Sequence, residues 1–133
     1  KTMKPTMIWA NLASEDLDKT IAFYTDLGFM PNGTLTKEGA SFIFAENDFV
    51  INFFTKSRMV EAMKGSVVDA KNQNEIIFSM SADTREEVEE WFEKVRNIGG
   101  TTFSEPEDFD NGYTFGFSDP DGHKFNILYW PEM

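Results

Sequence analysis

The chain has no cysteine and a single histidine, His123, among its 133 residues. The lack of cysteine excludes disulfides, thiolate metal sites and cysteine nucleophiles, and it is compatible with a reducing compartment, so we expect a cytoplasmic protein. Zinc favours nitrogen and sulfur donors, and one imidazole cannot supply a site that needs two. The composition therefore argues against a zinc centre built from one copy of the chain, and we expect a structural or solvent-facing role for His123.

Long apolar runs and positive charge are also scarce. No apolar stretch approaches the roughly 18–20 residues that span a bilayer, and no secretory signal pattern follows Lys1, although the sequence leaves open where the natural chain begins. With 23 acidic and 12 basic side chains the net charge is −11, so we expect neither nucleic acid nor a membrane as a partner. The acidity favours solubility or, alternatively, attraction of a cationic ligand.

The sequence does contain an aromatic-rich pattern that repeats. A hydrophobic fraction of 41% with 14 Phe and 7 Met suffices for one compact unit or two small fused modules. In the first half, a strand over residues 7–12 precedes a helix that Ser14 or Glu15 introduces and Gly28 ends. The apolar stripe of this helix consists of Leu17, Ile21, Tyr24 and Leu27.

The second half follows the same scheme. A strand over residues 76–80 precedes a helix whose first turn holds Thr84 and Glu87 at capping-box spacing. Gly99 and Gly100 end this helix. Its apolar stripe consists of Val88, Trp91, Phe92, Val95 and Ile98.

Three strand-like segments follow each predicted helix, which gives the order β-α-β-β-β twice and an α+β fold. The two modules cover about residues 5–56 and 74–131, and the linker 57–73 holds a short helix over residues 58–64. Chance similarity between two βα units is the alternative explanation. The strand-like segments are 29–34, 40–45 and 49–54 in the first half and 101–103, 113–118 and 125–130 in the second.

The most informative stretch lies near the end of the chain. The sequence Asp-Pro-Asp-Gly-His over residues 119–123 is typical of a tight turn, and the alternating residues after it predict a strand with two different faces. Asn126 lies on the more polar face, where it could serve a ligand. One face carries Phe125, Ile127 and Tyr129, and the other carries Asn126, Leu128 and Trp130.

Together these stretches resemble the vicinal oxygen chelate superfamily, which includes glyoxalase I, bleomycin-resistance proteins and extradiol dioxygenases. The residues that carry the resemblance are 11–17, 21–24 and 27–29, followed by the turn at 119–123. The resemblance implies a single domain over residues 1–133. Its eight strands would form a curved, half-closed mixed sheet with helices on the convex face and a ligand cup on the concave face. It also implies that modules pair within one chain or across a dimer, and we expect a homodimer.

Metal enzymes of this family place one ligand on the first and last strand of each module. The resemblance puts these four positions at Trp9, Asn52, Glu75 and Asn126. Only Glu75 is a strong ligand type, and one carboxylate with two amides makes a feeble site for Mg²⁺ or Mn²⁺. We therefore expect no metal and no other cofactor.

Alternation along the strands predicts which side chains line the cup. The more apolar side of each strand would contact the helices, and the mixed side would form an aromatic pocket with a few polar groups. The alternative is that this side fills a dimer contact or the second face of the sheet. The predicted ligand-binding residues are Trp9, Asn11, Asn52, Phe54, Glu75, Ser79, Phe117, Asn126, Leu128 and Trp130.

Three functions remain open from the sequence. The first is metal-independent binding or sequestration of a small aromatic or cationic compound, with Trp9 and Trp130 as stacking surfaces and Glu75 as charged partner. The second is a lyase, isomerase or dioxygenase in which a partly buried Glu75 acts as general base. The third is a protein-interaction module. An acidic loop over residues 105–110 is a weaker hypothesis for a Ca²⁺ site, because it lacks EF-hand spacing.

Overall fold

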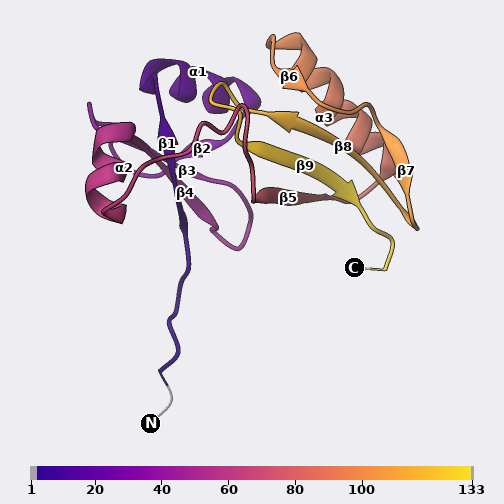
Figure 1. Ribbon diagram of the computed structural model, residues 1–133. Coiled ribbons are helices and arrows are strands. Elements are labelled where there is room, and N and C mark those ends of the chain that lie inside the picture. The colour runs from indigo at the N-terminus through magenta and orange to yellow at the C-terminus, as the bar shows by residue number, and fades with distance from the viewer. Residues whose placement is uncertain (1–2, 133) are drawn as a thin grey trace. The chain divides into compact units, whose positions relative to one another are not determined.

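A computed structural model describes residues 3–132 and holds three helices and nine strands within that range (Figure 1). The strands form two mixed sheets of four and five strands, so the predicted α+β class is confirmed. Contacts divide the chain into two compact units, residues 1–67 and 68–133, here called unit 1 and unit 2. None of the helices in the described range is long and apolar enough to cross a membrane.

Unit 1 contains one sheet and two helices. The strand order is β1-β4-β3-β2, with β1 parallel to β4 and the other neighbours antiparallel. The N-terminal segment ahead of β1 extends away from the sheet (Figure 1). The elements are β1 (Ala10–Ser14), α1 (Leu17–Leu27), β2 (Met30–Pro31), β3 (Gly39–Ile43), β4 (Val50–Thr55) and α2 (Lys56–Met63).

Helix α1 begins and ends at residues suited to those positions. The Asp16 carboxylate accepts hydrogen bonds from the backbone N–H groups of Asp18 (3.1 Å) and Lys19 (3.3 Å), so Asp16 is the N-cap. Gly28 ends the helix with a φ of 100°, as predicted. The predicted start at Ser14 or Glu15 is wrong, because Ser14 is a buried strand residue.

An aromatic cluster around Tyr24 holds α1 against the sheet. The Tyr24 side chain is fully buried and stacks on the ring of Phe53 in β4, with 4.7 Å between centroids. Phe23, Phe42 and Phe44 complete the cluster at centroid distances between 5.1 and 5.7 Å from Tyr24. Burial of these large rings accounts for much of the stability of unit 1.

Unit 2 contains the second sheet and one helix. Its strand order is β5-β9-β8-β6, with β7 paired to β8 and β5 parallel to β9. Helix α3 lies along one face of this sheet, where Phe92 packs edge-on against Phe115 at 5.4 Å. The elements are β5 (Ile77–Ala82), α3 (Arg85–Asn97), β6 (Thr101–Thr102), β7 (Glu107–Phe109), β8 (Gly112–Ser118) and β9 (Lys124–Tyr129).

Two strand predictions need correction. Strand β1 begins at Ala10 rather than at residue 7, because the residues before Ala10 have no strand partner in the described range. The acidic stretch proposed as a loop and Ca²⁺ site contains β7, whose backbone pairs with β8 from Glu107 to Phe109. The total is therefore nine strands in two sheets rather than eight.

The turn at residues 119–123 joins β8 to β9, as predicted. Asp119 is buried, and its Oδ1 accepts hydrogen bonds from the backbone N–H groups of Asp121 (3.0 Å) and His123 (2.9 Å). Gly122 has a φ of 97°, and a Cβ there would lie 2.6 Å from the Lys71 nitrogen. The motif therefore closes the hairpin and lets the segment at Ala70 and Lys71 pack directly on it.

Candidate functional site

The sheet of unit 2 has one face packed on α3 and one open face. Phe125 and Ile127 of β9 are fully buried on the α3 side, so Asn126 and Leu128, which alternate with them along the strand, point to the other side. In the sheet register, Asn126 lies between Ser79 of β5 and Gly116 of β8. We call this side the open face of unit 2; it carries Ser79, Phe103, Thr114, Gly116, Lys124, Asn126 and Leu128.

The amide of Asn126 is oriented by a chain of hydrogen bonds. The Thr114 hydroxyl donates to the carbonyl oxygen of Ile127 at 2.7 Å, which uses its only hydrogen. The same hydroxyl therefore accepts from the Asn126 Nδ2 group, which lies 3.3 Å away. This arrangement fixes which end of the amide is the oxygen. The Oδ1 atom faces away from Thr114 as a result.

Asn126 Oδ1 is buried and has no hydrogen-bond partner among the described residues. A buried acceptor without a donor costs roughly 1–3 kcal/mol. Native structures contain few such atoms, and each calls for an explanation such as a bound water or ion, a catalytic role or local strain. The open face of unit 2 therefore holds, just below its surface, an acceptor for which the described residues supply no donor, and a covering side chain must shift before a ligand donor can reach it.

An aromatic side chain stands next to this amide. The Phe103 ring lies over Gly116, so closely that a Cβ on Gly116 would overlap the tip of the ring. Only glycine at this position admits the ring to the open face. Phe103 stays 46% exposed, and the Lys124 ammonium lies 5.4 Å from its ring centroid. The face thus combines an acceptor, an aromatic wall and a positive charge.

Trp130 and Leu128 extend the same face. Leu128 pairs with Thr114 across β8 and β9. A Cβ on Gly112 would contact both the Trp130 ring at 2.9 Å and Leu128 at 3.2 Å, so these side chains lie side by side over Gly112. The structure brings the predicted residues Ser79, Asn126, Leu128 and Trp130 onto one face.

Unit 1 has a comparable open face opposite α1. Asn52 of β4 pairs with Asn11 of β1, and its Nδ2 donates to Asn11 Oδ1 at 3.0 Å. Phe54 shares this face and lies under the Arg58 guanidinium, 4.7 Å from its ring centroid. The predicted residues Asn11, Asn52 and Phe54 therefore lie on one face of unit 1. Ser41, which the sequence interpretation missed, extends the row beside Asn52.

Phe117 does not belong with the residues of the open face. It is fully buried on the α3 side and stacks on Phe125, with 5.3 Å between centroids and 8° between ring planes. The prediction chose the wrong parity for β8, because both Phe115 and Phe117 fill the core under α3. Gly116 and Thr114 take the places on the open face.

Glu75 lies apart from the position expected for it. It is exposed in a bend ahead of β5, so the partly buried carboxylate required of a general base is not found in the described structure. Trp9 lies seven residues before the N-cap of α1, and Ile77 lies seven residues before the N-cap of α3. Ile77, not Glu75, is therefore the counterpart of Trp9. Trp9 itself precedes β1 and is 53% exposed.

This correction bears on the metal that the resemblance implies. The four corresponding positions hold Trp9, Asn52, Ile77 and Asn126. None has a carboxylate, imidazole or thiolate, and two amide oxygens are weak ligands for a divalent ion. The residues present do not fit a metal.

One other group of possible ligand atoms exists in the turn of unit 2. Ligand atoms of Asp119, Asp121 and His123 lie within 4.8 Å of one another. The Asp119 carboxylate, however, already accepts the two backbone hydrogen bonds that shape the turn. We interpret this group as part of the turn.

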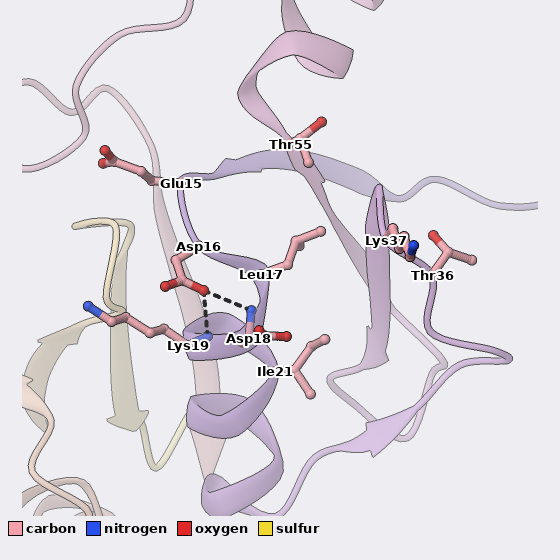
Figure 2. A pocket seen from close by; sticks show the side chains of 9 residues that line it. All are labelled: Glu15, Asp16, Leu17, Asp18, Lys19, Ile21, Thr36, Lys37 and Thr55. Atoms are coloured by element: carbon pink, nitrogen blue, oxygen red, sulfur yellow. Dashed lines mark hydrogen bonds between the residues drawn. The ribbon is translucent and has the colours of Figure 1, made fainter.

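A cavity of about 580 Å³ lies in unit 1 at the start of α1 (Figure 2). Leu17 and Ile21 form its apolar side, and the Asp16 carboxylate occupies the backbone N–H groups at the helix start. The cavity contains none of the predicted site residues. Its lining consists of Glu15, Asp16, Leu17, Asp18, Lys19, Ile21, Thr36, Lys37 and Thr55.

Comparison with known proteins agrees with the resemblance found in the sequence. The profile of the Glyoxalase/Bleomycin resistance protein/Dioxygenase superfamily matches residues 6–127. No curated protein matches the chain. Among solved structures, a hypothetical protein from S. aureus is 28% identical, with a TM-score of 0.83 over 96% of this chain and 95% of its own.

Two further structures have names that state a function. Lactoylglutathione lyase from Agrobacterium tumefaciens is 22% identical, with a TM-score of 0.68 over 96% of each chain. A bleomycin resistance determinant encoded on the transposon Tn5 is 20% identical, with a TM-score of 0.65 over 96% of this chain and 99% of its own. At these identities the likeness concerns the fold.

Proposed function

Because the chain belongs to the Glyoxalase/Bleomycin resistance protein/Dioxygenase superfamily, we propose that it binds a small planar organic molecule without a metal. The observation that carries the proposal is the buried, unpartnered Oδ1 of Asn126 beside the Phe103 ring. A ligand with an O–H or N–H group on a ring would supply the missing donor and pack against Phe103. Ser79, Leu128 and Trp130 would border it.

The absence of metal in this proposal rests on donor chemistry. The four positions that correspond to the family's metal ligands hold the indole of Trp9, the aliphatic side chain of Ile77 and the amides of Asn52 and Asn126. None of these side chains is a strong ligand for a divalent ion. Elemental analysis of protein purified without chelators tests this point. A stoichiometric divalent metal in such protein would contradict it.

We further propose the assembly that the resemblance implies. The two sheets would form one curved, half-closed surface with helices on the convex side, and two copies would associate as a homodimer. The exposed apolar side chains ahead of β1 support association, since Met7, Ile8 and Trp9 are 56%, 79% and 53% exposed. Light scattering coupled to gel filtration tests the dimer, and a monomer at micromolar concentration would contradict it.

The same exposed segment is the one observation that favours the alternative of a protein-interaction module. A different partner protein would then cover Ile8 and Trp9. Glu75 has no comparable support as a catalytic base, because it is exposed. Thermal-shift measurements separate binding of small molecules from binding of a partner protein.

The binding proposal is tested by NMR titration of the whole, ¹⁵N-labelled chain with 4-hydroxybenzyl alcohol, a neutral ring that carries a phenolic donor. We expect saturable shifts of the Asn126 side-chain amide and the Gly116 backbone amide. The variant Asn126→Ala, which lacks that side-chain amide, should lose the shift of the Gly116 amide, while Asn97→Ala, at an exposed position at the end of α3, should keep both shifts. Unchanged spectra up to millimolar ligand, for this compound and the charged analogues described below, would overturn the proposal.

A further inference from the structure

Lys124 on the open face of unit 2 is half-buried, yet no carboxylate of the described residues lies within ion-pair distance of it. The ion pairs identified among the described residues involve other basic residues, namely Lys56, Arg58 and Arg85. The charge of Lys124 is therefore not neutralised by an ion pair within the described residues, although the chain holds 23 acidic and 12 basic side chains. The Lys124 ammonium is therefore available to bind an anionic group of a ligand.

The immediate surroundings of Lys124 compensate its charge only in part. The ammonium lies 5.4 Å from the Phe103 ring centroid, a cation–π contact that is weak at an exposed ring. Its neighbours across the sheet are Ile77 on β5 and Ser118 on β8, neither of which is charged. An anionic oxygen would complete the environment far better than these neighbours do.

Lys124 and Asn126 are two residues apart on one strand, so their side chains leave the same face about 7 Å apart. One ring with polar groups at its two ends bridges such a distance. Phe103 lies alongside both residues, over Gly116. Asn126 Oδ1 could thus accept a hydrogen bond from one end of a ligand, and the Lys124 ammonium could bind an anionic group at its other end. The Phe103 ring would pack against the ring between these two groups.

From this arrangement we infer that the ligand carries an anionic oxygen group, a carboxylate or a phosphate, held by Lys124 while its donor binds Asn126 Oδ1. The inference rests on the proposed function and specifies its ligand class. It departs from the cationic ligand that the sequence suggested from the net charge, the Trp9 and Trp130 rings and Glu75, because that expectation did not consider Lys124.

The test uses four probes that share the phenolic donor and differ in charge. These are 4-hydroxybenzyl alcohol, tyramine, 4-hydroxyphenylacetate and 4-hydroxybenzylphosphonate. Dissociation constants come from the shifts of the Asn126 and Gly116 amides. We expect at least one of the two anions to bind about fivefold or more tightly than the alcohol, and tyramine to bind more weakly. The two anions distinguish a carboxylate from a phosphate-type ligand.

A matched pair of lysine variants tests whether Lys124 causes the preference for anionic probes. Lys124→Met should abolish the preference for anions, so that the two anions bind no more tightly than the alcohol does in the same variant. Lys94→Met should retain it, because Lys94 makes a similar cation–π contact with Trp91 on helix α3, at 5.7 Å. Equal binding of all four probes, tighter binding of tyramine, or a preference that persists in Lys124→Met would overturn this inference and leave the binding proposal standing. Absence of binding by every probe would overturn both.

Discussion

Asn52 and Asn126 occupy corresponding positions in the two units, but their amides are used differently. Each lies on the last strand of its sheet in chain order and pairs with the first strand in parallel, with Asn11 and Ser79 respectively. Asn52 donates to the Asn11 amide. Asn126 donates to Thr114, and its oxygen has no partner among the described residues. Both units therefore have an asparagine at this position, but only in unit 2 does its amide oxygen lack a donor among the described residues.

This difference predicts that replacement of asparagine by leucine affects stability differently at positions 126 and 52. Asn126→Leu removes a buried acceptor without a donor together with a long hydrogen bond to Thr114 (3.3 Å), and it leaves Thr114 bonded to Ile127. We expect the free energy of unfolding to stay the same or rise by about 1 kcal/mol. Asn52→Leu removes a satisfied hydrogen bond and should be neutral or destabilising by up to about 1 kcal/mol. Urea unfolding measures both, and a loss above about 1 kcal/mol for Asn126→Leu would assign Asn126 a structural role.

Gly116 and Phe103 should be energetically coupled. A Cβ at Gly116 would overlap the Phe103 ring, so Gly116→Ala must displace that ring from the open face. We expect a destabilisation of about 1–2 kcal/mol in the native background and much less when Phe103 is alanine. A double-mutant cycle measures the coupling. Equal effects of Gly116→Ala in both backgrounds would contradict the contact.

Gly122 should tolerate alanine less well than Gly33 does. Both have positive φ angles, 97° and 83°, so each alanine costs about 1–2 kcal/mol of backbone strain. At Gly122 a Cβ would also lie 2.6 Å from the Lys71 nitrogen, whereas nothing lies within 4 Å at Gly33. We therefore expect Gly122→Ala to be the more destabilising by at least about 1 kcal/mol in thermal unfolding. Similar losses would show that the segment at Lys71 moves freely.

Tyr113 links β8 to α3 in a way that depends on pH. Its hydroxyl donates to Glu89 Oε2 at 2.7 Å, and this hydrogen bond, followed by burial and the negative charge of Glu89, raises the Tyr113 pKa above 10.0. A raised pKa in the folded state means that the contribution to stability is present below about pH 10 and is lost as the pH rises through the folded value.

Glu89→Gln should therefore lower the Tyr113 pKa, as followed by ultraviolet absorbance of the phenolate. The positive charge of Arg85, whose guanidinium lies 4.0 Å from the Tyr113 ring centroid, lowers the Tyr113 pKa and would no longer be opposed by the charge of Glu89. Glu90→Gln, on the same helix, is the control and should leave the titration unchanged. An identical titration in Glu89→Gln would contradict the assigned cause.

The sequence predicted much of the local structure because short-range chemistry sets it. The turn at 119–123 and the helix end at Gly28 follow from the side chains and φ preferences of those residues, and both were found as expected. Strand β7 was missed because Glu107 and Asp108 look like loop residues, and only pairing with β8 makes them a strand. Phe117 was placed on the wrong face because parity within β8 depends on which rings α3 covers.

The sequence by itself determined the superfamily and the α+β class, since these depend on residue types, spacing and periodicity. Tertiary structure decided that Ile77 rather than Glu75 corresponds to Trp9, that Phe103 lies over Gly116, and that Asn126 Oδ1 is buried without a donor. Register and packing join residues far apart in the chain, and no local pattern encodes which atoms they leave unpaired.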